Sequence, residues 1–227
     1  MRGIAYGIGV GPGDPELMSL KAVRLIRECA VIAVPGRTAE ESAAYRIAAA
    51  AVPEIADKET VAVSMPMTRD RAALEAAHRE AASLLESHLD RGEDVAYLSL
   101  GDPSVYCTFG YLMRILKEDG YDTGTVPGVT SFCAAASRLG ITLAEGDEPL
   151  HVIPGSGIPE DIADRKGTFV IMKSGRGMSK VRDLLSGSGK NVTAVENCGM
   201  RGEKVYGSLE DIPDDAGYFT LIVAKDC

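Results

Sequence analysis

The sequence predicts an α/β protein in two halves, the first built on a mainly parallel sheet and the second on a mixed, more antiparallel sheet. In the first half, short apolar runs rich in β-branched residues alternate with helical stretches, the pattern of strands joined by crossover helices. Beyond Gly140 the strand-like runs continue, with fewer and shorter helical stretches between them. The length of 227 residues suits one large α/β domain or two compact halves. We place the joint near Val126–Gly128 and expect domains at residues 1–127 and 128–227.

The first half is expected to contain five strands joined by crossover helices. The strands are expected at Ile4–Val10, Ala30–Val34, Thr60–Ser64, Asp94–Leu100 and Thr123–Val126. The helices are expected at Pro15–Glu28, Glu41–Ala51, Asp70–Asp90 and Ser104–Glu118. In the third helix, a repeat of about 3.6 residues gathers one apolar face, made of Leu74, Ala77, Ala81, Leu84, Leu85 and His88. We expect Glu75 and Arg79 to pair on the opposite face, and we interpret His88 as a partly buried packing residue.

The second half is expected to contain a further set of short strands. They are expected at Leu150–Ile153, Thr168–Lys173, Val192–Glu196, Lys204–Ser208 and Tyr218–Ala224. Because the helices between them are fewer and shorter than in the first half, antiparallel pairings should be frequent here.

Charge and cysteine usage exclude several classes of function. The chain carries 24 Lys and Arg against 33 Asp and Glu, a formal charge of −9, without the basic run that a duplex-binding protein needs. We therefore expect no nucleic-acid partner, although a local basic patch could still bind an anionic ligand. The five cysteines are scattered, without a CxxC pair, which argues against a protein-bound metal. Without a leader pattern or an apolar segment of bilayer length, we expect a cytoplasmic protein with no membrane partner.

Three glycine-containing strings follow predicted strands and lead toward helices. They are Gly7–Pro15, Leu98–Tyr106 and Val126–Ser131. Asp14 and Pro15 are ordinary helix-start residues, but the preceding glycines need another reason, such as close approach of a ligand or of another chain segment. Since ligands bind at the carboxyl ends of strands in open α/β sheets, the three strings should meet at one ligand.

Two nucleotide-binding motifs are absent from these strings. The dinucleotide fingerprint GxGxxG fails in both registers, because its last position falls on Pro12 or Asp14. The phosphate-binding GxxxxGK[ST] motif also fails, because Asn191 follows Gly189-Lys190. A nicotinamide oxidoreductase and a nucleotide triphosphatase therefore lack support.

Taken in order, the motifs GxGPGDP from Gly9, GDPxVY from Gly101 and VPGxTS from Val126, with the later Met172, resemble the tetrapyrrole methyltransferase family over essentially the whole chain. The resemblance implies two α/β domains with S-adenosylmethionine bound in a folded conformation in the cleft between them, and it implies a homodimer. The segments Gly101–Phe109, Arg138–Glu148 and Gly217–Val223 look most like the precorrin-2 and cobalt-factor II C20-methyltransferases. The sister C11 and C17 enzymes, the uroporphyrinogen III methyltransferases and the diphthine synthases share the glycine strings and stay open as alternatives.

The resemblance also implies which residues contact the cofactor. The residues expected to line its pocket are Pro12, Gly101, Asp102, Val105, Thr130, Ser131 and Met172. The residues expected to close over the adenine are Asn197, Phe219, Thr220 and Leu221.

The implied reaction transfers a methyl group to C20 of an anionic tetrapyrrole and releases S-adenosylhomocysteine. The sulfonium cofactor supplies the activated methyl group, so the protein mainly has to align the reactants. Asp102 is a candidate base for the C20 proton, and a purely cofactor-binding role for it is equally open. Candidate substrate contacts are Gly11, Gly13, Arg37, Arg69, Arg71, Tyr106, Lys173 and Arg176. Tyr106, Phe109, Met113 and Leu116 are expected on one helical stripe, in the core or at a dimer face. A non-catalytic nucleotide-ligand-binding module is the alternative from another class.

Overall fold

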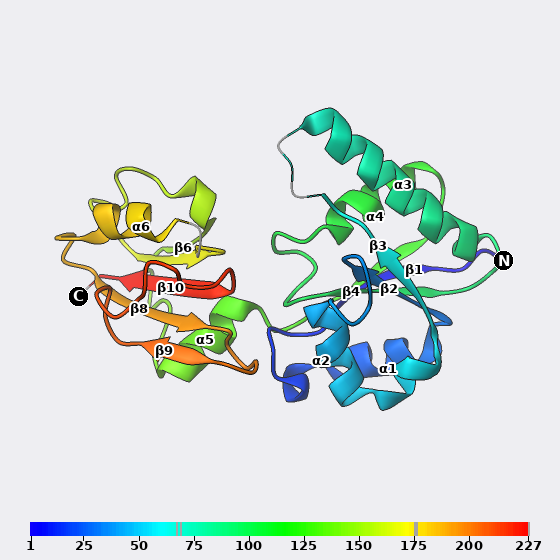
Figure 1. Ribbon diagram of the computed structural model, residues 1–227, viewed down its shortest axis with the longest axis horizontal. Coiled ribbons are helices and arrows are strands. Elements are labelled where there is room, and N and C mark those ends of the chain that lie inside the picture. Colours follow the sequence, from blue (N-terminus) through cyan, green and yellow to red (C-terminus); the bar gives the residue numbers. More distant parts are fainter. Residues whose placement is uncertain (67, 69, 175–176, 227) are drawn as a thin grey trace. The chain divides into compact units, whose positions relative to one another are not determined.

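A computed structural model describes residues 1–66, 68, 70–174 and 177–226. The chain divides into two compact units, Met1–Thr130 and Ser131–Cys227, each with its own sheet (Figure 1). The division falls just after the Val126–Gly128 segment. Among the described residues, no helix is both long enough and apolar enough to cross a membrane.

The first unit contains a parallel sheet, as predicted. Its strands are β1 (Ala5–Gly9), β2 (Val31–Pro35), β3 (Glu59–Val63), β4 (Val95–Ser99) and β5 (Thr123–Val126). They lie in the order β3-β2-β4-β1-β5, and every neighbouring pair is parallel. All five fall on the apolar runs that predicted them.

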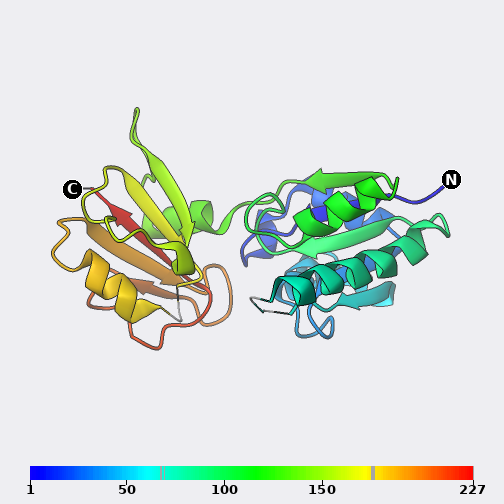
Figure 2. The ribbon, with the colours of Figure 1, turned by 90° about the horizontal axis from the view of Figure 1, so that it is seen from above.

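Helices cover both faces of this sheet (Figures 1 and 2). The helices α1 (Leu20–Glu28) and α2 (Ala43–Ala51) lie on one face, and α3 (Arg71–Leu89) and α4 (Phe109–Glu118) lie on the other. Short 3-10 helices at Pro15–Leu17 and Pro53–Asp57 complete the connections. The helices α3 and α4 pack onto the sheet through a buried cluster that includes Leu85, Leu89, Phe109, Leu112 and Leu116.

The helices of the first unit begin later than expected, α1 and α4 by the most. The stretch Pro15–Glu28 is interrupted, because Ser19 accepts a hydrogen bond from the N–H of Ala22 and caps a new helix there. The helix expected from Ser104 begins at Phe109, since Tyr106 lies before it in a left-handed conformation with φ 47°. Tyr106 is therefore exposed and separate from the stripe, whereas Phe109 and Leu116 are fully buried in the core.

In α3 the predicted face is partly wrong. Ala81, Leu85 and His88 are buried, but Leu84 is exposed, and Leu89 is buried although it was left out of the apolar face. The expected pair of Glu75 with Arg79 does not form. Instead Glu75 pairs with Arg71, while Arg79 reaches Glu86 and Asp119. The contact with Asp119, beyond the end of α4, is a tertiary one that helical periodicity cannot reveal.

The second unit contains the predicted mixed sheet. Its strands are β6 (Leu150–Pro154), β7 (Thr168–Met172), β8 (Asn191–Glu196), β9 (Lys204–Tyr206) and β10 (Thr220–Lys225). Their order is β6-β7-β10-β8-β9, with β6 and β7 parallel and the other neighbours antiparallel. Separate apolar clusters pack α5 (Ser131–Leu139) and α6 (Met178–Leu185) against the strands. A 3-10 turn at Gly155–Gly157 follows β6.

Candidate functional site

In the first unit the chain reverses its direction of winding between β1 and β4. These strands are neighbours, with Gly9 opposite Ser99. The connection from β1 leads past β4 to β2, whereas the connection from β4 leads past β1 to β5. Such a switch point is where open α/β sheets bind ligands. The three glycine strings follow β1, β4 and β5, which are adjacent, so they leave the sheet together, as predicted. We call Gly9–Gly13, Gly101–Tyr106 and Gly128–Thr130 the glycine edge.

Main-chain contacts hold the first two strings together. Gly11 donates its N–H to the carbonyl of Gly101 at 3.3 Å, and Gly101 donates back to the carbonyl of Gly11 at 2.8 Å. Both residues have positive φ, 77° and 73°, which favours glycine.

The third string packs just as closely. A Cβ on Gly9 would lie 2.6 Å from the Gly101 oxygen and 2.7 Å from the Gly128 nitrogen, and a Cβ on Gly128 would lie 2.2 Å from the Gly101 oxygen. Glycine at positions 9 and 128 therefore allows the three strings to meet. Part of the glycine pattern thus serves chain packing.

Asp102 ties the second string to the third. Its carboxylate accepts hydrogen bonds from the N–H and hydroxyl of Ser104, and the N–H of Gly128 donates to it at 2.9 Å. Partial burial by itself would raise the pKa of Asp102, but these hydrogen bonds together hold that pKa below its ordinary value. The carboxylate is therefore ionised at neutral pH, and both of its oxygens accept hydrogen bonds.

The glycine edge also carries an unused hydroxyl. The Thr130 Oγ1 atom is buried and has no hydrogen-bond partner in the described part of the chain. Since buried polar groups are normally paired, this hydroxyl fits a role in binding a polar ligand. Gly11, which belongs to the Gly11–Gly101 pair, is buried, and so are the next two residues, Pro12 and Gly13. Val105 is half-buried.

The Arg and Lys residues predicted to contact the substrate lie further apart in the chain and do not belong to one set of loops. Arg37 is exposed in the connection after β2, and Arg71 begins α3, where it pairs with Glu75. Lys173 is exposed in the second unit, directly after β7. Arg69 and Arg176 lie outside the described residues.

The candidates of the second unit gather at one edge of its sheet. Because β7 and β8 both run antiparallel to β10, their carboxyl ends flank the start of β10. Met172 ends β7, Asn197 follows β8, and Phe219 precedes the first β10 residues, Thr220 and Leu221. Asn197 donates its N–H to the Phe219 carbonyl at 3.3 Å. Ser131, in contrast, is the first residue of α5.

Two residues at this edge have unusual backbone conformations. Lys173 and Asn197 have φ 58° and 53°, left-handed values that are costly for a residue with a side chain, above all for lysine. Such conformations concentrate at functional sites.

Several residues at this edge were missed by sequence reasoning. The Ser174 hydroxyl donates to the Thr220 carbonyl at 3.0 Å, and the buried carboxylate of Glu196 accepts from the Gly217 N–H at 2.9 Å. A signal for Glu196 existed, because it alternates with the apolar Val192 and Ala194 on the inner face of β8. A charged side chain on such a face needs partners.

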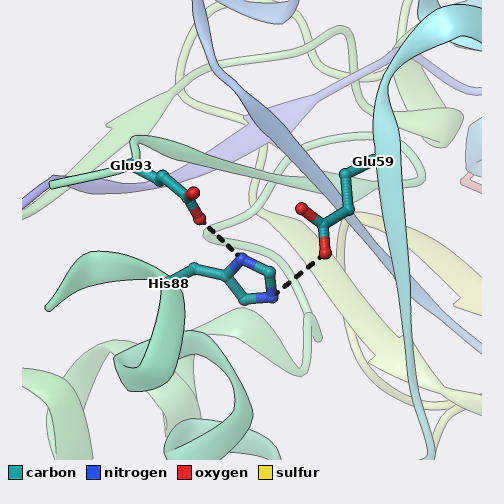
Figure 3. Close-up of side chains that lie close together, drawn as sticks. All are labelled: Glu59, His88 and Glu93. Atoms are coloured by element: carbon teal, nitrogen blue, oxygen red, sulfur yellow. Dashed lines mark hydrogen bonds and ion pairs between the residues drawn. The ribbon is translucent and has the colours of Figure 1, made fainter. Parts of the chain in front are cut away.

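One His-carboxylate cluster has the composition of a metal site. Figure 3 shows His88 between two carboxylates, with Nδ1 2.9 Å from Glu93 Oε2 and Nε2 4.0 Å from Glu59 Oε1. The two ring nitrogens face different carboxylates, so a single ion cannot replace both contacts. Arg91 Nη2 lies 2.6 Å from the same Nδ1 and 2.8 Å from Glu93, where it already supplies a positive charge.

The position of this cluster agrees with a packing role. Glu59 begins β3, and Glu93 precedes β4, so the cluster lies at the amino ends of the strands, opposite the glycine edge. His88 is buried there and joins the end of α3 to the sheet.

Comparisons with known proteins identify the family of this chain. The sequence profile of the tetrapyrrole (corrin/porphyrin) methylases matches residues 5–213. A probable cobalt-precorrin-2 C(20)-methyltransferase of Methanocaldococcus jannaschii is 32% identical, with 97% of this chain and 95% of the relative aligned. The cobalt-precorrin-2 C(20)-methyltransferase of Salmonella typhimurium is 29% identical, over 99% and 97% of the two chains.

The structural comparisons agree with the sequence comparisons. The uroporphyrin-III C-methyltransferase of Thermus thermophilus, solved with S-adenosylhomocysteine, is 26% identical and superposes with a TM-score of 0.71 over 98% of this chain and 92% of that one. A cobalt precorrin-4 methyltransferase, 23% identical, has the same fold, with a TM-score of 0.75 over 98% and 94% of the two chains. The glycine edge, the mixed second sheet and the match along nearly the whole chain thus lead to one conclusion: the protein belongs to the tetrapyrrole (corrin/porphyrin) methylase family.

Proposed function

We propose that the protein transfers the methyl group of S-adenosylmethionine to C20 of precorrin-2 or of its cobalt-containing counterpart, cobalt-factor II, in cobalamin biosynthesis. The other product is S-adenosylhomocysteine. Alignment with relatives named as C20-methyltransferases along almost their full length supports this reaction. The observation that carries the cofactor proposal is the glycine edge, where the Gly11–Gly101 pair and the Asp102–Gly128 hydrogen bond hold three loops together.

The cofactor fits the groups that this chain offers. In the first unit we assign Pro12, Gly101, Asp102, Val105 and Thr130 to its binding. The Thr130 hydroxyl, which has no partner among the described residues, serves as a hydrogen-bonding group. In the second unit we assign Ser131, Met172, Asn197, Phe219, Thr220 and Leu221. The bound cofactor supplies a methyl group on a positively charged sulfur, which is already activated for transfer.

The protein contributes to the reaction mainly by orienting the methyl donor and the acceptor ring. Holding the methyl donor and the ring carbon in line can supply several kcal/mol of the barrier without a nucleophilic side chain. Asp102 is poorly suited to remove the C20 proton, because its pKa is lowered and both oxygens already accept hydrogen bonds. We therefore assign Asp102 to the binding framework.

The substrate carries several carboxylates, which need cationic or hydrogen-bonding partners. We propose Arg37 and Lys173 as cationic contacts, and Gly11, Gly13 and Tyr106 as contacts along the glycine edge. We further propose a cytoplasmic homodimer. Among the described residues, Cys29, Cys107, Cys133 and Cys198 form no disulfide, which agrees with a reducing compartment.

The experiment is a methyl-transfer assay with isotopically labelled S-adenosylmethionine. The acceptor is precorrin-2, the reduced form of sirohydrochlorin, in one assay and cobalt-sirohydrochlorin in the other. Mass spectrometry should show the gain of one methyl group, and NMR should locate it on C20. Methylation at C11 or C17 would instead indicate a sister activity. Cofactor binding without turnover on either ring would indicate a non-catalytic ligand-binding module.

A further inference from the structure

The Glu196 carboxylate is a buried charge at the last position of β8. Only 8% of the residue is exposed. Burying a carboxylate is costly unless strong hydrogen bonds replace its water. Glu196 Oε2 accepts from the Tyr206 hydroxyl at 2.8 Å, and Oε1 accepts from the Gly217 N–H at 2.9 Å. Lys204 Nζ lies 3.8 Å from Oε2. Each oxygen therefore has a donor from a different part of the chain.

Tyr206 is a dependable donor in this arrangement. Burial, and then the hydrogen bond to Glu196, raise the pKa of Tyr206 to about 12, so the hydroxyl keeps its proton at neutral pH. Tyr206 lies on β9, which pairs with β8. This hydrogen bond therefore joins two strands that are already neighbours.

The contact with Gly217 joins β8 to a loop. Gly217–Thr220, which we call the 217–220 segment, leads into β10, and Thr220 lies opposite Glu196 in the β8–β10 register. A Cβ on Gly217 would lie 2.6 Å from Glu196 Oε1, so this close approach depends on glycine. The Thr220 hydroxyl donates to the Gly217 carbonyl at 2.8 Å and closes the segment into a tight turn.

The other end of the segment is also fixed. The Phe219 carbonyl accepts from the Asn197 N–H, and the Thr220 carbonyl accepts from the Ser174 hydroxyl. The Tyr218 and Phe219 rings project from this turn, about two-fifths exposed and packed edge to face at 5.2 Å between centroids. A rigid turn thus presents an aromatic surface of the kind on which a purine ring can stack.

We propose that Glu196 is a positioning residue that holds the 217–220 segment in its cofactor-binding conformation. The proposal rests on the proposed function, which assigns Phe219 and Thr220 to the cofactor. Glu196 acts through the Gly217 N–H and makes no contact with the cofactor itself. Its loss should therefore weaken cofactor binding while leaving the transfer step nearly unchanged.

The test compares three variants of the full chain. Glu196→Ala removes both hydrogen bonds, Glu196→Gln keeps an oxygen that can accept from Gly217, and Tyr206→Phe removes only the bond within the sheet. Titration with S-adenosylhomocysteine should show an affinity about tenfold lower for Glu196→Ala and within about threefold of wild type for the other two. The KM for S-adenosylmethionine should follow the affinity, while kcat changes by less than about threefold.

Amide hydrogen exchange without any ligand provides an independent measurement. The 217–220 amides should exchange faster in Glu196→Ala than in Tyr206→Phe, because only the first variant releases Gly217. Equal exchange in these two variants, or an affinity loss in Tyr206→Phe as large as in Glu196→Ala, would overturn the positioning role. A wild-type protein that binds no S-adenosylhomocysteine would overturn the proposed function and the cofactor role of the segment, whereas the exchange data would still decide whether Glu196 fixes Gly217.

Discussion

Asp102 and Gly128 are joined by a hydrogen bond of 2.9 Å that connects the loops after two strands separated in the sheet by β1. We expect Asp102→Ala to leave the Gly128 N–H unpaired, to cost about 1–2 kcal/mol of stability and to lower cofactor affinity at least tenfold. Calorimetry and chemical denaturation would measure the two effects. Wild-type affinity in a folded Asp102→Ala variant would contradict the framework role.

The lowered pKa of Asp102 predicts how stability and activity vary with pH. Because the folded-state pKa lies below the unfolded value, the stabilisation from this group is complete above about pH 5 and is lost only as pH falls through the folded pKa. Asp102 should therefore contribute no titration to kcat between about pH 5 and 8. Rate profiles of wild type and Asp102→Asn should have the same shape in this range. An acidic limb that disappears in the variant would identify Asp102 as a base.

The close packing of the glycine strings predicts a strong effect at Gly128. Gly128→Ala places a Cβ against the Gly101 carbonyl and should destabilise the first unit by about 1–3 kcal/mol or displace the loop, with loss of activity. Gly110→Ala is the matched control, since Gly110 is in a helix and its added Cβ would meet no described atom within 4 Å beyond its chain neighbours and its own helix backbone. The Gly110→Ala variant should be more stable than the wild type by about 0.5–1 kcal/mol. Thermal unfolding of both variants provides the comparison.

The buried Thr130 hydroxyl predicts opposite effects on stability and binding. Thr130→Val keeps the shape and removes a polar group without a partner among the described residues, so the free protein should be as stable as wild type or slightly more stable. S-adenosylhomocysteine binding should weaken about tenfold. Thr130→Ser, which keeps the hydroxyl, should bind within about threefold of wild type. Equal affinity of Thr130→Val and wild type would remove Thr130 from the site.

The His88 cluster predicts a change in stability without a change in catalysis. His88→Ala removes the contacts with Glu93 and Glu59 and should cost about 1–3 kcal/mol in the free energy of unfolding. The KM for the cofactor should stay at its wild-type value. Addition of Zn²⁺ should leave the melting temperature of the wild type unchanged. A Zn²⁺-dependent stabilisation that His88→Ala abolishes would show that the cluster binds metal.

Local sequence patterns were sufficient to predict most of the strands. The strand Thr123–Val126, for example, is marked by a short apolar run, and the helical stretches between such runs predict that the strands are parallel. Both signals are local in the sequence. The errors arose where a side chain redirects the chain. Ser19 starts a new helix inside the expected one, and Tyr106 takes a left-handed conformation that delays α4.

The candidate site could be predicted where its residues form continuous motifs. The three glycine strings meet as expected, because each follows one of three adjacent parallel strands. Glu196 alternates with the apolar Val192 and Ala194 on β8, but this pattern does not identify its partner, since Gly217 lies 21 residues further along the chain. Hydrogen bonds between such distant positions depend on the folded register, which composition and periodicity do not encode.

The pairing of Gly11 with Gly101 uses main-chain atoms alone. The pairing itself therefore needs no particular side chain, although Gly9 and Gly128 beside it must stay without a Cβ. Under the proposed function, substitutions at exposed positions such as Arg37 and Tyr106 would change contacts with the acceptor ring and leave this main-chain pairing in place.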